Sequence, residues 1–343
     1  MKEAMFYTKA QEQAVNCHLC NHHCHIKLDK HGICGVRKNQ DGNLWSLVYG
    51  KVITQHIDPI EKKPLYHFYP GTQSYSIATV GCNFRCTFCQ NADISQSPRE
   101  DRSIYGNTVA AESIVEQARK TGCASISYTY TEPTIFMEYA LDVARLAHGV
   151  GIKNIFVSNG YMTEESLEAI APYLDAANVD LKAFSDHFYA KQCGAHLEPV
   201  QKTLARMKEL GIWLEVTTLL IPGLNDDPAE LTEMVKFLSS LGPETPWHIS
   251  RFHPAYRLMD RPVTPIRTLQ NARDIGLKGG LQYVYLGNVP GDAGENTYCR
   301  QCRALLIERY GFTIQNRGLE GGKCATCGAV MAGVGTAGLS RAG

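Results

Sequence analysis

The sequence lacks net charge, because 34 basic residues balance 34 acidic ones among its 343 residues. A balanced chain has no general electrostatic attraction for nucleic acid or for a membrane surface, so nucleic acid is not an expected partner. No run of about 18 apolar residues occurs, so we expect no helix that crosses a bilayer. The N-terminal stretch MKEAMFYTKAQEQ lacks the apolar core of a secretory signal. We therefore expect a cytoplasmic protein that does not bind a membrane.

Cysteine, in contrast, is abundant. Thirteen cysteines in a chain without a secretory signal indicate reduced thiols and metal ligands and not disulfides. Eleven of them fall into three groups, whereas cysteines used as small apolar residues scatter through a core. The groups are Cys17, Cys20, Cys24 and Cys34; Cys82, Cys86 and Cys89; and Cys299, Cys302, Cys324 and Cys327. Each group predicts a metal site.

From residue 74 to about 290, short apolar runs alternate with amphipathic stretches, which predicts parallel strands joined by helical crossovers. The expected strands span 74–80, 124–129, 154–159, 176–182, 212–221, 247–252 and 281–288. The expected helices span 108–122, 134–151, 163–174, 199–211, 227–242 and 265–277. Six such units are too few for an eightfold barrel, so the expected fold class is α/β with a partial (β/α)6 TIM-like barrel. Its chemistry should lie at the C-terminal ends of the strands.

The other segments do not show this alternation of strand and helix patterns. Residues 1–50 and 291–330 are rich in glycine and cysteine, and we expect them to form small metal-binding modules on either side of the 74–290 barrel. Residues 51–73 contain three prolines and are expected to form a connecting arm. The small residues of 331–343 predict a disordered tail.

The central cysteine group, in GCNFRCTFCQNADIS at 81–95, has three thiols and not the four that a zinc or iron–sulfur site usually takes. Three thiolates can hold a [4Fe–4S] cubane and leave one iron open to a substrate or cofactor. The alternative is a zinc site with a remote fourth ligand. Because the loop follows the first expected barrel strand, the cubane is favoured, with Phe88 shielding it.

This loop resembles the C-x3-C-x-aromatic-C hallmark of the radical S-adenosylmethionine (SAM) superfamily. The barrel is similar to that of pyruvate formate-lyase activating enzyme. Nearly all of the chain resembles the radical SAM member of the AmmeMemoRadiSam system, on the stretches CHLCNHHCHI, GICGVR, DPIEKKPLYHFYPGT, YTYTEPTIFMEY, LLIPGLND and NTYCRQCRALLIER.

The resemblance implies a radical SAM enzyme with oxidoreductase chemistry. In that family a reduced [4Fe–4S] cluster, here on the catalytic ligands Cys82, Cys86 and Cys89, cleaves SAM to methionine and a 5′-deoxyadenosyl radical. The radical then abstracts hydrogen from a substrate, which is a small molecule or a protein. A flavodoxin or ferredoxin is the implied reductant. The alternative function is activation of a glycyl radical enzyme. A third class, an iron–sulfur electron carrier, is disfavoured by the SAM-site motifs.

The resemblance also implies SAM contacts at the strand ends. Thr131 and Glu132 stand where the activating enzyme has a Gly-Gly-Glu that binds the methionine amino group. Ser158 and Asn159 match the motif after the third strand, where Val157 replaces an aspartate that contacts SAM and helps to bind a monovalent cation.

Three further residues complete the implied SAM site. Asp180 and Lys182 in DLK match the activating enzyme, and Lys182 suits the carboxylate of SAM. His253 in FHP matches a SAM-contacting histidine. The alternative for all these strand-end residues is polar filling of a barrel mouth.

The terminal groups differ in spacing. Cys299, Cys302, Cys324 and Cys327 form C-x2-C-x21-C-x2-C, which is typical of a structural zinc ribbon, with mononuclear iron as the alternative. The N-terminal C-x2-C-x3-C-x9-C fits zinc or an auxiliary iron–sulfur cluster, and its short knuckle-like span favours zinc. Cys193, after the fourth expected strand, is either a functional thiol, as a substrate contact or hydrogen-atom donor, or a buried thiol.

Overall fold

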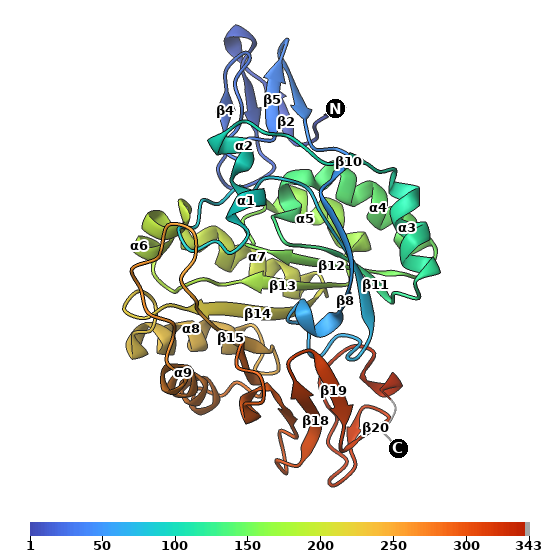
Figure 1. The fold of residues 1–343 in the computed structure, drawn as a ribbon, viewed down its shortest axis with the longest axis vertical. Coiled ribbons are helices and arrows are strands. Elements are labelled where there is room, and N and C mark those ends of the chain that lie inside the picture. The colour runs from blue at the N-terminus through green and yellow to red at the C-terminus, as the bar shows by residue number, and fades with distance from the viewer. Residues whose placement is uncertain (340–343) are drawn as a thin grey trace.

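The computed structural model describes residues 1–339, and within them the largest element is an eight-stranded sheet (Figure 1). The strand order is β16-β15-β14-β13-β12-β11-β9-β8, so β16 and β8 form its edges. The strands are β8 (Thr54–Pro59), β9 (Gln73–Ala78), β11 (Ser125–Tyr128), β12 (Lys153–Ser158), β13 (Ala176–Asp180), β14 (Trp213–Leu220), β15 (Trp247–Arg251) and β16 (Val284–Gly287). All neighbours from β9 to β16 are parallel, and β8 is antiparallel to β9.

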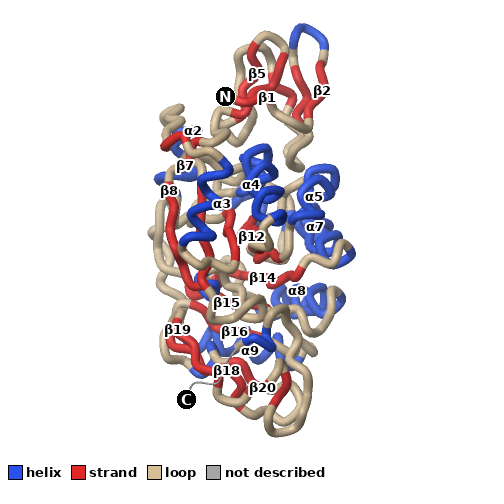
Figure 2. The backbone as a smooth tube through the Cα atoms, turned by 90° about the vertical axis from the view of Figure 1, so that its right-hand side faces the viewer, coloured by secondary structure: helices blue, strands red, loops and turns tan. Residues whose placement is uncertain are grey.

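Helices connect the successive parallel strands, which gives a mixed α/β fold. They are α3 (Ala111–Lys120), α4 (Met137–Gly149), α5 (Glu164–Ile170), α7 (Leu197–Glu209), α8 (Pro228–Ser240) and α9 (Ile266–Lys278). Figure 2 shows α5, α7 and α8 stacked along one side of the sheet. The strands and helices predicted between 74 and 290 are confirmed, with ends displaced by a few residues. No helix among residues 1–339 combines the length and the apolar composition that crossing a bilayer requires.

The local sequence explains these elements. In α3 the buried positions Ala111, Ile114, Val115 and Ala118 recur at the spacing of one helix face. The α8 helix begins at Pro228, where the side chain of Asp227 accepts hydrogen bonds from the first free backbone N–H groups. The central strand β11 is buried at every position, as expected for a parallel sheet that is covered on both sides.

Two smaller modules lie at opposite ends of the long axis (Figure 1). The N-terminal module contains β1 (Lys2–Glu3), β2 (Tyr7–Lys9), β3 (Val15–Cys17), β4 (His25–Ile26), β5 (Arg37–Gln40) and β6 (Asn43–Ser46). The C-terminal module contains β17 (Thr297–Tyr298), β18 (Leu305–Tyr310), β19 (Thr313–Asn316), β20 (Leu319–Glu320) and β21 (Lys323–Cys324). The short elements β7 (Lys51–Val52), β10 (Asn107–Thr108), α1 (Ala92–Ser95), α2 (Ser97–Glu100) and α6 (Asp186–Phe188) lie between them in the chain.

Two segments differ from expectation. The expected arm, 51–73, contains β8, which pairs with β9 from Thr54 opposite Ala78 to Pro59 opposite Gln73. The expected disorder of the tail is wrong for 331–339, because this stretch packs on residues 67–69 through backbone hydrogen bonds. A Cβ on Gly333 would lie 2.5 Å from the carbonyl oxygen of His67, so glycine is what permits this close packing. The rest of the expected tail, 340–343, lies outside the described residues.

A buried carboxylate ties the expected arm to the sheet. Glu215 of β14 accepts hydrogen bonds from the backbone N–H groups of Tyr66 (3.0 Å) and His67 (2.8 Å). Its oxygens also accept from the ring nitrogens of Trp213 (3.0 Å) and His248 (2.7 Å). Burial acts to raise the pKa of Glu215, but the hydrogen bond and charge of His248 outweigh burial, so this pKa lies below its ordinary value.

Replacing Glu215 by Ala should therefore lower the free energy of unfolding by about 3–5 kcal/mol, because it leaves three buried donors and the partly buried N–H of Trp213 without an acceptor. Denaturant titration measures this. The control Glu233→Ala removes only an exposed pair with Lys236 and should change stability by less than about 0.5 kcal/mol. The Glu215 contribution should be present above about pH 4.3 and be lost as the pH falls through the lower folded-state pKa. Equal losses in the two variants would contradict this role.

Candidate active site and metal sites

A cavity of about 580 Å³ lies at the C-terminal ends of the parallel strands. Its lining brings together every residue predicted for the cluster and for SAM, with one exception. The lining residues from that prediction are Cys82, Cys86, Phe88, Cys89, Thr131, Glu132, Ser158, Asn159, Asp180 and Lys182. The exception is His253, which is exposed and is not among the lining residues. Its neighbour Phe252 takes the buried position after β15.

The three cysteines lie on the loop between β9 and α1, and that loop is held by the chain segment behind it. The backbone N–H of Arg85 donates to the carbonyl of Cys193, and that of Thr87 donates to the carbonyl of Gln192, both at 2.9 Å. These bonds fix the backbone on both sides of Cys86.

The sulfur atoms have their own hydrogen-bond donors. The backbone N–H of Phe84 lies 3.3 Å from Cys82 Sγ, and the side-chain amide nitrogen of Asn159 lies 3.7 Å from the same atom. Ser95 Oγ lies 3.3 Å from Cys89 Sγ. Such donors stabilise thiolate sulfur, which is the form that binds iron.

Burial raises the pKa of the Cys82 thiol well above its ordinary value. A hydrogen bond with the Cys193 thiol, followed by burial, raises that of Cys86 in the same direction. Without a cation nearby, these three sheltered thiols resist ionisation. A bound metal would supply the positive charge that stabilises them as thiolates, so the arrangement suits a metal centre. The residues present therefore fit an iron–sulfur cluster.

Cys193 itself is fully buried and does not line the cavity. Its thiol lies against Cys86. Of the two possibilities open from the sequence, the structure supports the buried thiol, packed behind the cluster loop.

Glu132 accepts hydrogen bonds from its own loop and from the loop that follows β12. Its Oε1 accepts from the hydroxyls of Thr134 (2.6 Å) and Ser158 (2.8 Å) and from the backbone N–H of Thr134 (3.0 Å). Its Oε2 accepts from the backbone N–H of Asn159 (2.8 Å). The Asn159 side chain in turn donates to Asn83 Oδ1 (2.7 Å) in the cysteine loop. Glu132 thus couples the strand-end loops to each other.

Lys182 supplies a fixed positive charge to the cavity. Its Nζ donates to Asp180 (2.9 Å) and lies 5.8 Å from the centre of the Phe88 ring. Burial acts to lower the pKa of Lys182, but the negative charge of its partner Asp180 acts in the opposite direction, and the pKa lies well above the ordinary value. The ammonium group therefore stays protonated and faces the cysteine loop.

The sequence prediction missed two lysines and a tyrosine that line the same cavity. Lys62 (2.8 Å) and the buried Lys63 (2.7 Å) donate to Asp58 of β8, and the Tyr130 hydroxyl donates to the same carboxylate. Burial lowers the pKa of Lys63 to about 8. The available signal was the pair of adjacent lysines in IEKKPL, but the placement of this pair depends on β8, which was not expected.

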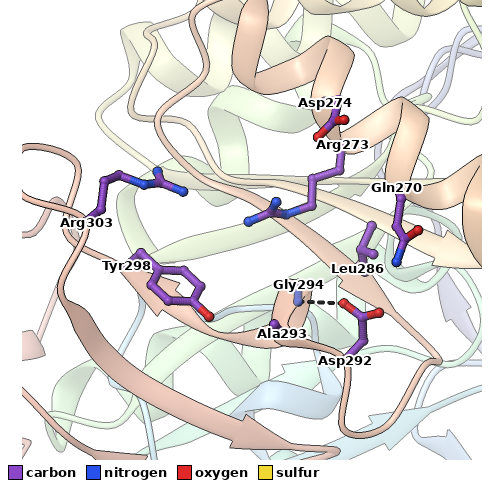
Figure 3. A pocket seen from close by; sticks show the side chains of 9 residues that line it. All are labelled: Gln270, Arg273, Asp274, Leu286, Asp292, Ala293, Gly294, Tyr298 and Arg303. Carbon is purple, nitrogen blue, oxygen red and sulfur yellow. Dashed lines mark hydrogen bonds between the residues drawn. The ribbon is translucent and has the colours of Figure 1, made fainter.

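A second hollow, of about 470 Å³, lies between α9, β16 and the C-terminal module (Figure 3). It is lined by Gln270, Arg273, Asp274, Leu286, Asp292, Ala293, Gly294, Tyr298 and Arg303. None of these residues is a predicted site residue. Asp292 already accepts from the backbone N–H of Gly294 at 2.7 Å. The chemistry predicted from the sequence is therefore concentrated in the strand-end cavity.

The four C-terminal thiols form a compact group. Their sulfur atoms lie within 4.8 Å of one another, with Cys299 and Cys327 at 3.6 Å and Cys302 and Cys324 at 3.6 Å. Among residues 1–339, no other group of three or more histidine, cysteine or carboxylate ligand atoms meets this spacing. The separation suits a single tetrahedral metal ion.

Comparison with known proteins agrees with this geometry. Residues 76–238 match the family model of the radical SAM superfamily. The chain is 50% identical over 331 residues to the uncharacterized protein MJ0808 of Methanocaldococcus jannaschii, and the match covers 96% of this chain and 98% of that protein. The chain belongs to the radical SAM superfamily. It is an enzyme of the radical SAM type, and the family implies a [4Fe–4S] cluster, SAM, a reductant and a substrate.

More distant relatives relate the chain to activating enzymes. A putative glycyl-radical enzyme activating enzyme, MJ1632 of the same archaeon, is 24% identical over 62% of this chain and 78% of its own length. A probable GTP 3′,8-cyclase of Pyrobaculum aerophilum is 25% identical over 66% and 77%, respectively. The crystal structure of a radical SAM methyltransferase from Sphaerobacter thermophilus shares the fold, with a TM-score of 0.51, 17% identity and coverage of 66% of this chain and 71% of that one.

Replacing Cys302 by Ser should remove one metal ion per chain and lower the melting temperature, because closing such a site contributes on the order of 10 kcal/mol to the folding of small metal modules. Metal analysis and thermal unfolding measure the two effects. The control Cys123→Ala changes a cysteine outside the three groups and should leave the metal content intact. A Cys302→Ser protein with unchanged metal and melting would contradict a structural site here.

Proposed function

We propose that this enzyme binds a [4Fe–4S] cluster at Cys82, Cys86 and Cys89 and cleaves SAM reductively, so that a 5′-deoxyadenosyl radical abstracts hydrogen from a small-molecule or protein substrate. The observation that carries the proposal is the placement of three sheltered thiols at the strand-end cavity, whose lining contains no fourth cysteine and no histidine. A [4Fe–4S] cluster held by three thiolates would have one iron without a protein ligand, and this iron would be open to the cavity. The open sheet then corresponds to the partial (β/α)6 barrel of this superfamily.

Each wall of the cavity has a distinct part in this proposal. Lys182 faces the carboxylate of SAM, and its own pairing with Asp180 holds its direction. Thr131, Ser158 and Asn159 provide polar groups for the methionine moiety, and Glu132 keeps their loops in place. A cavity of about 580 Å³ lies in the range that encloses a cofactor-sized molecule. These residues bind and orient SAM and exclude water from the reacting atoms.

The remaining assignments belong to the same proposal. A flavodoxin or ferredoxin supplies the electron, and the C-terminal cysteines hold zinc. The C-terminal assignment is supported by sulfur separations of 3.6 Å, since four thiolates at about 2.3 Å from zinc lie about 3.8 Å apart.

A second candidate is activation of a glycyl radical enzyme, which the name of the MJ1632 relative favours. The two candidates differ in their product. Incubation of the reduced enzyme and SAM with the glycyl radical enzymes of the host should give a protein-based glycyl radical signal by electron paramagnetic resonance (EPR) if the second candidate is right. Absence of that signal, with SAM still cleaved, favours the first.

The proposed function predicts that the anaerobically reconstituted protein releases 5′-deoxyadenosine from SAM in the presence of dithionite, even without substrate. Cys86→Ala should abolish this release, because two thiolates cannot hold the cubane. Chromatographic measurement of 5′-deoxyadenosine and iron analysis test this pair. Undiminished SAM cleavage in Cys86→Ala would refute the proposal.

Replacing Lys182 by Ala should weaken SAM binding about ten- to a hundredfold, because a charge-assisted hydrogen bond in a sheltered site contributes roughly 1.5–3 kcal/mol. The cluster should be retained, since its ligands lie on another loop. The matched control is His253→Ala, which changes an exposed side chain outside the cavity and should leave SAM binding unchanged. Titration with SAM, followed by EPR of the reduced cluster, measures both. Weakening by His253→Ala and not by Lys182→Ala would show that the SAM site is misplaced.

A further inference from the structure

The N-terminal module encloses four thiols on β3 and its neighbouring loops. Cys17, Cys20 and Cys34 are buried, and Cys24 is partly exposed. The sulfurs have hydrogen-bond donors of their own. The backbone N–H of Ile33 lies 3.5 Å from Cys24 Sγ, and a guanidinium nitrogen of Arg37 lies 3.9 Å from Cys17 Sγ. Cys17 and Cys34 belong to the same buried apolar cluster as Val15, Leu19, Ile26 and Val36. This environment is that of a sheltered metal centre.

The spacing of these sulfurs distinguishes them from the C-terminal group. Tetrahedral zinc–thiolate coordination places sulfurs about 3.8 Å apart, because each lies about 2.3 Å from one ion. Among residues 1–339 the four C-terminal sulfurs form a group of this compactness, whereas no three of the N-terminal sulfurs do. The three cysteines of the strand-end cavity do not form such a group either. A cubane binds each thiolate to a different iron, so its ligand sulfurs lie farther apart than those of a single ion.

A glycine lies against two of the N-terminal thiols. A Cβ on Gly32 would lie 3.2 Å from Ile26 Cδ1, 3.8 Å from Cys24 Sγ and 3.9 Å from Cys34 Sγ. A side chain at this position would therefore press on Ile26 beside the two thiols. Glycine lets this loop run close to Cys24 and Cys34.

The module packs directly on the loop that carries the other cluster site. The side chain of Arg99 donates to the carbonyls of Ile33 (2.6 Å) and Cys82 (2.5 Å), so it joins the two cysteine loops. A Cβ on Gly81, the residue before Cys82, would lie 3.5 Å from the carbonyl oxygen of Cys34 and 2.6 Å from a methyl carbon of Val36. The backbones that carry Cys34 and Cys82 are thus in contact.

The same interface has a second connection. A ring nitrogen of His22, which lies between Cys20 and Cys24 in the sequence, is 2.9 Å from the carbonyl oxygen of Asn83. Figure 1 shows the N-terminal strands next to α1 and α2, the helices that follow the cluster loop. A structural zinc module has no need of this position, whereas electron transfer falls steeply with distance and requires it.

We propose that Cys17, Cys20, Cys24 and Cys34 hold a second [4Fe–4S] cluster, which passes one electron from a ferredoxin- or flavodoxin-class reductant to the cluster site on Cys82, Cys86 and Cys89. The reductant is oxidised by one electron, the second cluster is reduced and then reoxidised, and the electron is delivered to the cluster that faces SAM. The relay rests on the proposed function, but the identity of the N-terminal metal does not.

The first test isolates the N-terminal site. The triple variant Cys82→Ala/Cys86→Ala/Cys89→Ala, reconstituted anaerobically with iron and sulfide in the presence of zinc, should retain about four irons per chain and, when reduced, a cluster EPR signal. Its zinc content should be about one per chain, from the C-terminal site. A protein with no iron and about two zinc ions per chain would overturn the second cluster. This result is independent of SAM cleavage, so it separates the proposal from the proposed function.

The second test concerns the relay. In the fully reduced wild-type protein, two clusters on loops that contact each other should broaden each other's EPR signals, so the spectrum should differ from the sum of those of the triple variant and of Cys20→Ala/Cys24→Ala. In stopped-flow mixing with reduced ferredoxin, the cavity cluster should be reduced rapidly in the wild type and slowly in Cys20→Ala/Cys24→Ala. Additive spectra, or reduction at the wild-type rate, would overturn the relay. If Cys20→Ala/Cys24→Ala does not fold, the wild-type protein is measured instead, with one cluster reduced and with both reduced. The EPR signal of the first cluster should broaden when the second is reduced, and an unchanged signal would overturn the relay.

Discussion

The site depends on backbone hydrogen bonds that fix the cysteine loop against the segment behind it. The N–H groups of Arg85 and Thr87 bind the carbonyls of Cys193 and Gln192, and so the residues on both sides of Cys86 are held. Because a loop of this kind has no regular secondary structure, its thiols would otherwise sample many arrangements and pay ordering entropy when metal binds. The loop follows β9, so the same bonds direct all three sulfurs to the strand-end cavity.

The other walls of the cavity are coupled to that loop through buried polar groups. Glu132 binds Ser158 and Asn159, and Asn159 reaches back to Cys82 and Asn83. A buried carboxylate that accepts several hydrogen bonds is held in position by them, and removing it leaves those donors without an acceptor. Some residues that the superfamily resemblance implies as cofactor contacts therefore also have a positioning role, which the spacing of the motifs does not reveal.

Much of the fold could be predicted from the sequence, because parallel strands and crossover helices are specified by local patterns. The apolar runs of β11 and β13 and the amphipathic faces of α3 and α8 are examples. Strand β8 was not predicted, because its pairing with β9 depends on a contact between an irregular segment and the sheet edge. The packing of 331–339 likewise depends on tertiary contacts with residues 67–69. Composition alone favoured disorder there.

The candidate site, like the fold, could be predicted only in part from the sequence. The strand-end motifs placed the cysteines, Lys182 and Asn159 at one cavity, since parallel strands end at a common edge. His253 is different because the chain after β15 directs Phe252 inward and leaves His253 exposed. Spacing alone also left the identity of the N-terminal metal open, because zinc and cubane sites share ligand types and differ in the separation of the sulfurs.

The central claim is that an open iron faces the cavity and binds SAM. Electron–nuclear double resonance of the reduced protein, with SAM labelled with ¹⁵N at the amino group and ¹⁷O at the carboxylate, tests it directly. The account predicts resolved coupling of both labels to the cluster, and a fully loaded cluster without coupling to either label would contradict it.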